Sequence, residues 1–204
     1  MALAVFDRDG EAALTPESPR LTPLPPKEWS KAAGEALAPL LPPTGRPKGE
    51  NRPKGLNALG VLARHPQLSL AYNTFSGQIM YGSTLSARHR ELLVLRVATV
   101  RGAEYEWRQH VASAGDNGVG PDEVARVIVG PYAPGWSVLE QALLRAVDEL
   151  LGDALIADDT WSMLAGELDE QQLMEVVFTV GAYDTLAMAL RTFGVPLDED
   201  LENQ

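Results

Sequence analysis

The chain has 204 residues, 45% of them hydrophobic, which is enough for one sizeable core and permits one or two domains. It contains no cysteine, and this excludes disulfide frameworks, thiolate zinc sites and cysteine-based redox or nucleophilic chemistry. Its formal net charge of -11 argues against partners such as nucleic acid or an anionic membrane surface.

The charge is divided unevenly along the chain. Residues 1–115 carry 14 Lys or Arg against 10 Asp or Glu, whereas residues 116–204 carry 3 against 18. We expect the acidic half to be mainly a solvated outer surface. The basic half contains the segment with the strongest functional signal. Five arginines occur in that segment: Arg88, Arg90, Arg96, Arg101 and Arg108.

Targeting and membrane-spanning segments are not expected. The chain has no run of about 18 apolar residues, the length that a membrane-spanning helix needs. The residues after Met1 lack the basic start and the apolar stretch of a signal peptide. We therefore expect a cytoplasmic protein.

The first 54 residues are rich in proline. Ten of the 15 prolines precede Lys54, and proline supplies no backbone donor and disfavours a preceding helical turn. We expect an extended arm over 1–54 with one short helix near 27–40. Such an arm is either disordered or wraps over its own domain or a neighbouring subunit, and its apolar content favours wrapping.

From Leu56 onward, brief turn signals separate segments of helical length. Ser86 and Ser137 are expected N-caps, and Pro121 suits the first turn of a helix. No useful stretch shows the period-two alternation of a half-buried strand, and no glycine-rich phosphate loop occurs. We predict an all-α domain over 55–196 and an acidic tail over 197–204. The expected helices are 56–64, 66–80, 86–101, 103–116, 121–129, 137–151, 158–166 and 169–192.

The last predicted helix is apolar on nearly every face over 176–193. Such a helix must be buried all round. In a domain of this size, the chain's own helices together with a subunit interface would bury it, which favours a homo-oligomer. Asp184 is an exception within this helix, and we expect it to pair with an arginine across the interface.

The helix expected at 86–101 carries a carboxylate where an apolar residue belongs. At 100° per residue, Glu91 lies in the middle of an apolar arc, which Arg88 and Arg96 border on one side. A carboxylate that faces a core is costly unless it is paired or hydrogen-bonded. Glu91 therefore forms a structural ion pair with Arg88 or acts as an acid tuned by its surroundings. The apolar arc consists of Leu92, Val94, Leu95 and Ala98.

The next helix, expected at 103–116, has a similar feature. Trp107 helps to define its inward face, and Glu106 and His110 border and enter that face. These two residues are spaced i, i+4, so their side chains are neighbours on one side of the helix. A carboxylate that orients an imidazole suits proton transfer near neutral pH. Two carboxylates and one histidine on consecutive helices therefore form a candidate catalytic site.

The same residues carry a resemblance to a known family. The segment 86–119, which reads SARHRELLVLRVATVRGAEYEWRQHVASAGDNGV, resembles the core motif of the carboxymuconolactone decarboxylase/AhpD-like superfamily. The peroxidase branch has Glu-x11-Cys-x2-Cys-x3-His, and counting from Glu91 puts Ala103 and Glu106 at the cysteine positions and His110 at the histidine. The decarboxylase branch has Glu-x3-His at this point, which Glu106 and His110 reproduce.

The resemblance is strong over 56–130 and looser through 192. The decarboxylase branch tends to have histidine before this glutamate, where the chain has Tyr105. The resemblance implies an antiparallel helical fold, obligate oligomers such as dimers, trimers or hexamers, and no cofactor in the decarboxylase branch. The implied activity is decarboxylation of, or proton transfer on, a small cyclic carboxylic acid or lactone.

In this hypothesis of decarboxylation or proton transfer, His110 is the proton donor, Glu106 orients it, and Glu91 shapes the site or shuttles protons. Arg88 or Arg96 would hold a substrate carboxylate by charge-assisted hydrogen bonds. Tyr72 and Trp107 could line an apolar substrate pocket, although aromatic residues at helical spacing more often belong to the core.

The same residues bear on three other functions. A thiol peroxidase is excluded because it needs a thiolate. A catalytically silent oligomer that binds a small acid, or serves only as a scaffold, remains an alternative. A metal site of Glu91, Glu106 and His110 is the third option, but the resembled family requires no metal, so we expect none.

Overall fold

The computed structural model describes residues 16, 18–41 and 54–202, and all regular secondary structure in this part of the chain is helical. The predicted all-α fold is confirmed. The α-helices are α1 (Lys31–Glu35), α2 (Leu56–Leu62), α3 (Pro66–Gly77), α4 (Ala87–Arg101), α5 (Glu104–Ser113), α6 (Pro121–Val129), α7 (Val138–Asp153), α8 (Asp158–Ala165), α9 (Glu170–Phe193) and α10 (Glu199–Glu202). Shorter helical turns are η1 (Pro26–Glu28), η2 (Ala38–Leu40), η3 (Gln78–Gly82) and η4 (Gly115–Asn117).

The helix boundaries follow the local sequence signals. All eight helices predicted between 56 and 192 are present, each within three residues of its expected ends. The predicted caps are also observed, since the hydroxyl groups of Ser86 and Ser137 accept from the backbone N–H of His89 and Glu140. Each cap satisfies a backbone donor that the first turn of a helix leaves without an intrahelical partner.

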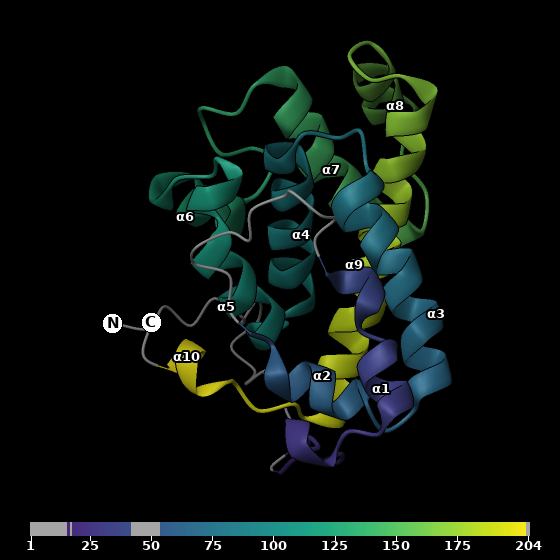
Figure 1. Cartoon of the computed structure of the whole chain (residues 1–204). Helices are drawn as coiled ribbons and strands as arrows, with labels where there is room; N and C mark the ends of the chain where they lie inside the picture. The colour runs from purple at the N-terminus through teal and green to yellow at the C-terminus, as the bar shows by residue number, and fades with distance from the viewer. Residues whose placement is uncertain (1–15, 17, 42–53, 203–204) are drawn as a thin grey trace.

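Helix α4 is the centre of the molecule (Figure 1), with α9 on one side and α5 and α6 on the other. Every residue from Glu91 to Ala98 is buried. One apolar cluster joins α4 to α7, α8 and α9 through residues such as Leu93, Leu143 and Val176. A second cluster joins α4 to α5, α6 and α7. A helix enclosed on all sides holds its polar residues in fixed positions.

Helix α9 is packed on α4 but is not buried all round. Met174, Val177 and Phe178 are exposed on its first half, and the Phe178 ring meets the edge of Phe75 from α3. By length and composition this helix could also cross a membrane, a criterion that a core helix meets as well. The chain's own helices thus leave one apolar face of α9 open.

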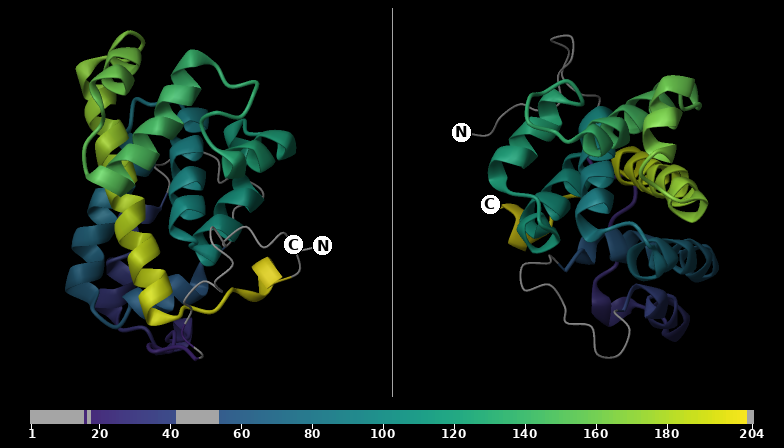
Figure 2. Two further views of the ribbon diagram at one scale, coloured as in Figure 1. Left: turned by 180° about the vertical axis from the view of Figure 1, so that it is seen from behind. Right: turned by 90° about the horizontal axis from the view of Figure 1, so that it is seen from above.

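The described part of the proline-rich arm lies on the chain's own helices. Arg64 donates from Nη2 to the carbonyl oxygen of Thr22 at 2.7 Å, and Asn73 donates from Nδ2 to that of Ala36 at 2.8 Å. In Figure 2 this segment runs beside α2 and α3. The predicted single helix near 27–40 is split into η1, α1 and η2. Residues 1–15 and 42–53 of the predicted arm lie outside the described residues.

The segment after α9 is anchored to the domain through Asp198. This carboxylate accepts from the Tyr105 hydroxyl at 2.7 Å and from the backbone N–H of Asn57 at 2.8 Å. Leu201 of α10 is fully buried. The start of the predicted acidic tail therefore packs against α2 and α5.

Candidate functional site

Two polar side chains meet between α4 and α5. His110 Nδ1 lies 2.9 Å from Glu91 Oε1, and Asn117 donates from Nδ2 to Glu91 Oε2, also at 2.9 Å. Both carboxylate oxygens therefore have a partner, and the Glu91 side chain is only 6% exposed. The His110 side chain is 20% exposed, and its Nε2 has no hydrogen-bond partner among the described residues. The imidazole is thus held by one nitrogen and available at the other.

Glu106 lies one turn before His110 on α5 but does not hold the imidazole. The residue is 2% exposed, and neither carboxyl oxygen has a hydrogen-bond partner in the described structure. Burial, and after it the charge of Asp184, raises the pKa of Glu106 well above its ordinary value of 4.5. The structure thus favours the neutral acid at this position. The expectation that Glu106 orients His110 is wrong, because Glu91 makes that contact.

Two tyrosines complete the cluster. The Tyr183 ring of α9 packs edge-on against the His110 ring, with centroids 5.3 Å apart and planes at 81°. Burial raises the pKa of Tyr183, and the charges of Glu91 and Glu106 add to that rise. Burial likewise raises the pKa of Tyr72 to about 12. The Tyr72 hydroxyl donates to the carbonyl oxygen of Ala182 at 3.0 Å. Tyr72, which was expected to line a substrate pocket, therefore contacts the backbone of α9 next to Tyr183.

The two arginines expected to bind substrate lie in ion pairs instead. Arg88 binds Glu123 and Glu140, with closest distances of 2.6 Å to each. Arg96 forms a two-pronged contact with Asp148 at 2.7 and 2.8 Å and also donates to backbone carbonyl groups of α6. In the described structure no hydrogen bond joins either guanidinium to Glu91 or His110. Both arginines join α4 to α6 and α7, which does not support a role in substrate binding.

Three other residues singled out from the sequence have structural positions. Trp107 packs in the apolar cluster of α4, α5, α6 and α7, so it belongs to the core. Tyr105 anchors Asp198, as described above. Asp184 does pair with an arginine, but that residue is Arg101 of the same chain, at 2.5 Å. The predicted contact across a subunit interface is therefore wrong.

Two members of the cluster, Asn117 and Tyr183, were not identified from the sequence. Asn117 lies seven residues after His110 but in η4, beyond the end of α5, so helical spacing did not indicate its contact with Glu91. Tyr183 lies in a distant helix and carried no local signal. Within the described part of the chain, no group of three or more His, Asp or Glu side chains could hold a metal ion.

The site residues lie in a segment that is similar to a known protein family. The profile of the carboxymuconolactone decarboxylase family matches residues 66–149, a range that includes Glu91, Glu106 and His110. A search of curated proteins gave no match.

Several solved structures share the fold. The debrominase Bmp8, in its apo form, covers 90% of this chain and 94% of its own, with 13% identity and a TM-score of 0.71. A protein of unknown function from Agrobacterium tumefaciens, named as a candidate AhpD antioxidant defence protein, covers 73% of this chain and 99% of its own, with 19% identity and a TM-score of 0.63. An uncharacterised peroxidase-related protein from Silicibacter sp. TM1040 covers 71% and 79%, with 14% identity and a TM-score of 0.62.

At these identities the structures share the fold alone. The family profile spans the two helices that carry the site, and the structural likeness extends over most of the chain. Residues 66–149 are thus similar to the carboxymuconolactone decarboxylase family, and the fold is the AhpD-like fold, in a chain without any cysteine.

Proposed function

We propose that this protein performs cofactor-free decarboxylation or proton transfer on a small cyclic carboxylic acid or lactone. The observation that carries the proposal is the 2.9 Å contact between Glu91 and His110 Nδ1, which leaves Nε2 available. A histidine fixed by a carboxylate at one nitrogen is suited to move a proton at the other. The absence of cysteine removes the thiol chemistry that the peroxidase branch uses.

In the proposed reaction, the bond between the ring carbon and the carboxylate breaks and carbon dioxide leaves. The electron pair moves into the enol or lactone system, and His110 Nε2 delivers a proton to the carbon. Solvent then returns a proton to Nε2, so atoms and charge balance. A positioned acid of this kind contributes roughly 10²–10⁴-fold to the rate.

Glu106 is the second acid of the proposed site. As a neutral carboxyl group it can donate a hydrogen bond to the oxygen on which negative charge develops, whereas an ionised one would repel that charge. With Arg88 and Arg96 in ion pairs, Arg90 is a better candidate to hold the substrate carboxylate. Among the described residues its guanidinium makes one long hydrogen bond, 3.4 Å to the Leu85 carbonyl oxygen, and its charge opposes the rise in the pKa of Tyr183.

His110→Gln tests the proposal. The wild-type protein should release carbon dioxide from one or more members of a panel of cyclic carboxy-lactones and β-keto acids, and the variant should lose at least about 100-fold in kcat/KM. His89→Gln, on the half-buried first turn of α4, is the matched control and should keep full activity. Unchanged activity in His110→Gln would contradict the assigned role. Ligand binding without conversion in the wild type would favour the alternative of a silent binding or scaffold protein.

The proposal includes self-association through the open face of α9. Phe75, Met174, Val177 and Phe178 present contiguous apolar surface there, which a second copy of the chain would cover. Phe178→Glu should shift the wild-type oligomer toward the monomer, as measured by light scattering after gel filtration. A wild-type protein that is monomeric at micromolar concentration would contradict this part of the proposal.

A further inference from the structure

The hydrogen bonds of Asn117 determine how the Glu91 carboxylate is used. Asn117 Nδ2 lies 2.9 Å from Glu91 Oε2 and 3.3 Å from the backbone carbonyl oxygen of Ser113. A carbonyl oxygen can only accept a hydrogen bond, so the NH2 group of the amide, and not its oxygen, faces Ser113. The same NH2 group faces Glu91, and Oε2 therefore accepts.

The other oxygen of Glu91 determines which ring nitrogen of His110 carries a proton. Oε1 lies 2.9 Å from His110 Nδ1, and the Glu91 side chain is 6% exposed. A buried carboxylate needs hydrogen-bond donors, and Asn117 supplies one of them. Imidazole is a stronger base than a carboxylate, so the proton between the two groups stays on Nδ1. In its neutral form, His110 therefore has its lone pair on Nε2.

His65 is the opposite case within the same chain. Its Nδ1 accepts from the backbone N–H of Leu68 at 3.2 Å. A backbone N–H can only donate, so neutral His65 has its lone pair on Nδ1 and its proton on Nε2. The two histidines are expected to be opposite tautomers, and His65 is thus an internal reference for a measurement on His110.

The lone pair of His110 lies at an accessible edge of the site. The side chain is 20% exposed, and Nε2 has no hydrogen-bond partner among the described residues. The edge-on contact with Tyr183 restricts the orientation of the ring. Glu106, one turn earlier on α5, is 2% exposed, and neither of its carboxyl oxygens has a partner in the described structure. A base and a neutral acid therefore come from one helix.

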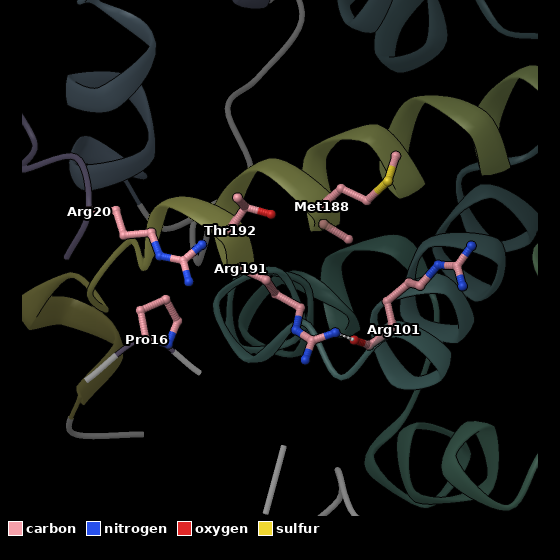
Figure 3. Close-up of a pocket in the computed structure, with 7 residues that line it drawn as sticks. Pro16, Arg20, Arg101, Met188, Arg191 and Thr192 are labelled. Atoms are coloured by element: carbon pink, nitrogen blue, oxygen red, sulfur yellow. Dashed lines mark hydrogen bonds between the residues drawn. The ribbon is translucent and has the colours of Figure 1, made fainter. Parts of the chain in front are cut away.

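This group is separate from the pocket beside the second half of α9. Figure 3 shows that pocket, which has a volume of about 420 Å³ and is lined by residues such as Arg101, Met188 and Thr192. His110 is not among the described residues that line it. A molecule held there would not contact Nε2, so the accessible edge of His110 is where a substrate meets the base.

We propose that the site also has an isomerase activity, in which neutral His110 removes a carbon-bound proton next to the carbonyl group of a small unsaturated lactone. This inference rests on the proposed function, because it uses the same site, but the substrate needs no carboxylate. The imidazolium form of His110 is the acid of the proposed decarboxylation, whereas the neutral form is a base at the same atom.

The proposed step balances atoms and charge. The bond between carbon and hydrogen breaks, the proton moves to His110 Nε2, and the electron pair moves toward the carbonyl oxygen. Glu106 donates a hydrogen bond to that oxygen, and Glu91 balances the charge of the imidazolium. The proton then returns to the same carbon or to the far end of the conjugated system. Return at the far end gives the conjugated isomer.

The first measurement is the tautomer of each histidine in the full chain. Nitrogen-15 NMR of histidine-labelled protein, at a pH at which the rings are neutral, should show His110 protonated at Nδ1 and His65 protonated at Nε2. Glu91→Gln should reverse His110, because the oxygen of the new amide faces Asn117 and its NH2 group donates to Nδ1. A wild-type His110 protonated at Nε2 would overturn the proposal, and this result needs no substitution.

The second measurement follows α-angelica lactone, an unsaturated lactone without a carboxylate, in D2O by proton NMR. The full chain should accelerate exchange of the ring hydrogens next to the carbonyl group and formation of the conjugated isomer. Saturated γ-valerolactone, whose hydrogens are much less acidic, should not exchange. His110→Gln removes the base and Glu91→Gln leaves it in the wrong tautomer, so each should reduce the catalysed rate about 100-fold. His89→Gln is the matched control and should exchange as the wild type does.

Hydrogen exchange and carbon dioxide release are separate readouts, so the two proposals can fail independently. Release of carbon dioxide from carboxy-lactones without exchange in α-angelica lactone would overturn the isomerase activity and leave the proposed decarboxylation in place. Exchange without release of carbon dioxide would support the isomerase activity and contradict decarboxylation. A Glu91→Gln protein that exchanges at the wild-type rate would also overturn the inference, since the base would then not depend on its carboxylate partner.

Discussion

Two buried glutamates, one on α5 and one on α7, differ in their partners. Glu140 of α7 is 8% exposed and Glu106 of α5 is 2% exposed. Glu140 accepts hydrogen bonds from Arg88 and from the backbone N–H of Ser137, whereas Glu106 accepts none from the described residues. Burial on its own raises the pKa of both carboxyl groups. At Glu140 the hydrogen bonds outweigh burial and leave the pKa below its ordinary value, whereas at Glu106 the pKa is raised.

This difference separates a stabilising role from a functional one. A buried carboxylate with an arginine partner and backbone donors contributes to the connection between helices. A buried carboxyl group without partners lowers the free energy of unfolding, since its desolvation is not compensated. Such groups are retained at sites where their chemistry is needed, and Glu106 lies one turn from His110. Substitutions of the paired residues and of Glu106 test this difference.

The largest effect on stability is expected for an arginine of α4 that is paired with a carboxylate. Arg96 is 4% exposed as a side chain and holds Asp148 through two hydrogen bonds. Arg96→Met leaves Asp148 and the α6 carbonyl groups without their partner, and should lower the free energy of unfolding by about 3 kcal/mol. Urea denaturation measures this change. Arg126→Met, which removes an arginine that the structure stacks on Trp136, should cost well below half as much.

A smaller effect of opposite sign is expected at Glu106. Glu106→Met replaces an unpartnered buried carboxyl group by an apolar side chain of similar length, and should raise the free energy of unfolding at pH 7 by about 1–2 kcal/mol. The variant should at the same time lose the proposed activity. Glu140→Met is the matched control and should be less stable than the wild type, because it removes a partner of Arg88. A less stable Glu106→Met protein would show that the carboxyl group has partners in solution.

The limits of the sequence prediction follow from the same residues. The helices and the convergence of Glu91 with His110 were predictable, because helical periodicity fixes which residues share a face. The direction in which the Glu106 side chain points was not predictable, because two residues at i, i+4 spacing can adopt rotamers that separate their side chains.

The acidic half of the chain was expected to be mainly a solvated surface, and three of its carboxylates do not fit that expectation. Glu123, Glu140 and Asp148 instead bind the arginines of α4, through contacts that span 35 to 52 residues along the chain. Tertiary packing decides these pairs, and no local pattern encodes them.

The dependence of stability on pH offers a sharper test of Glu106. Its folded pKa is raised, so the unfolded chain loses this proton near pH 4.5 while the folded protein retains it. The contribution of this group to stability is therefore complete below pH 4.5 and is lost as the pH rises through the folded value. Between pH 4.5 and 8, the wild type should lose stability relative to Glu106→Gln, which cannot titrate. Parallel curves from urea denaturation of the two proteins would contradict an uncompensated acid at this position.

The smallest expected effect concerns the ion pair of Arg88 and Glu123 at low pH. The hydrogen bond from Arg88 is the main cause that lowers the pKa of Glu123 to about 2. A lowered pKa reverses the sign found for Glu106: the stability is present above pH 4.5 and is lost as the pH falls toward 2. Because both side chains of this pair are more than a quarter exposed, solvent and salt screen the interaction and keep the change small. Glu123→Gln should reduce the fall of the melting temperature between pH 5 and 2. Salt at 1 M should reduce the difference between this variant and the wild type. A loss of stability at low pH that the substitution leaves unchanged would assign it to Glu140, the other carboxylate that binds Arg88 and whose pKa is also lowered.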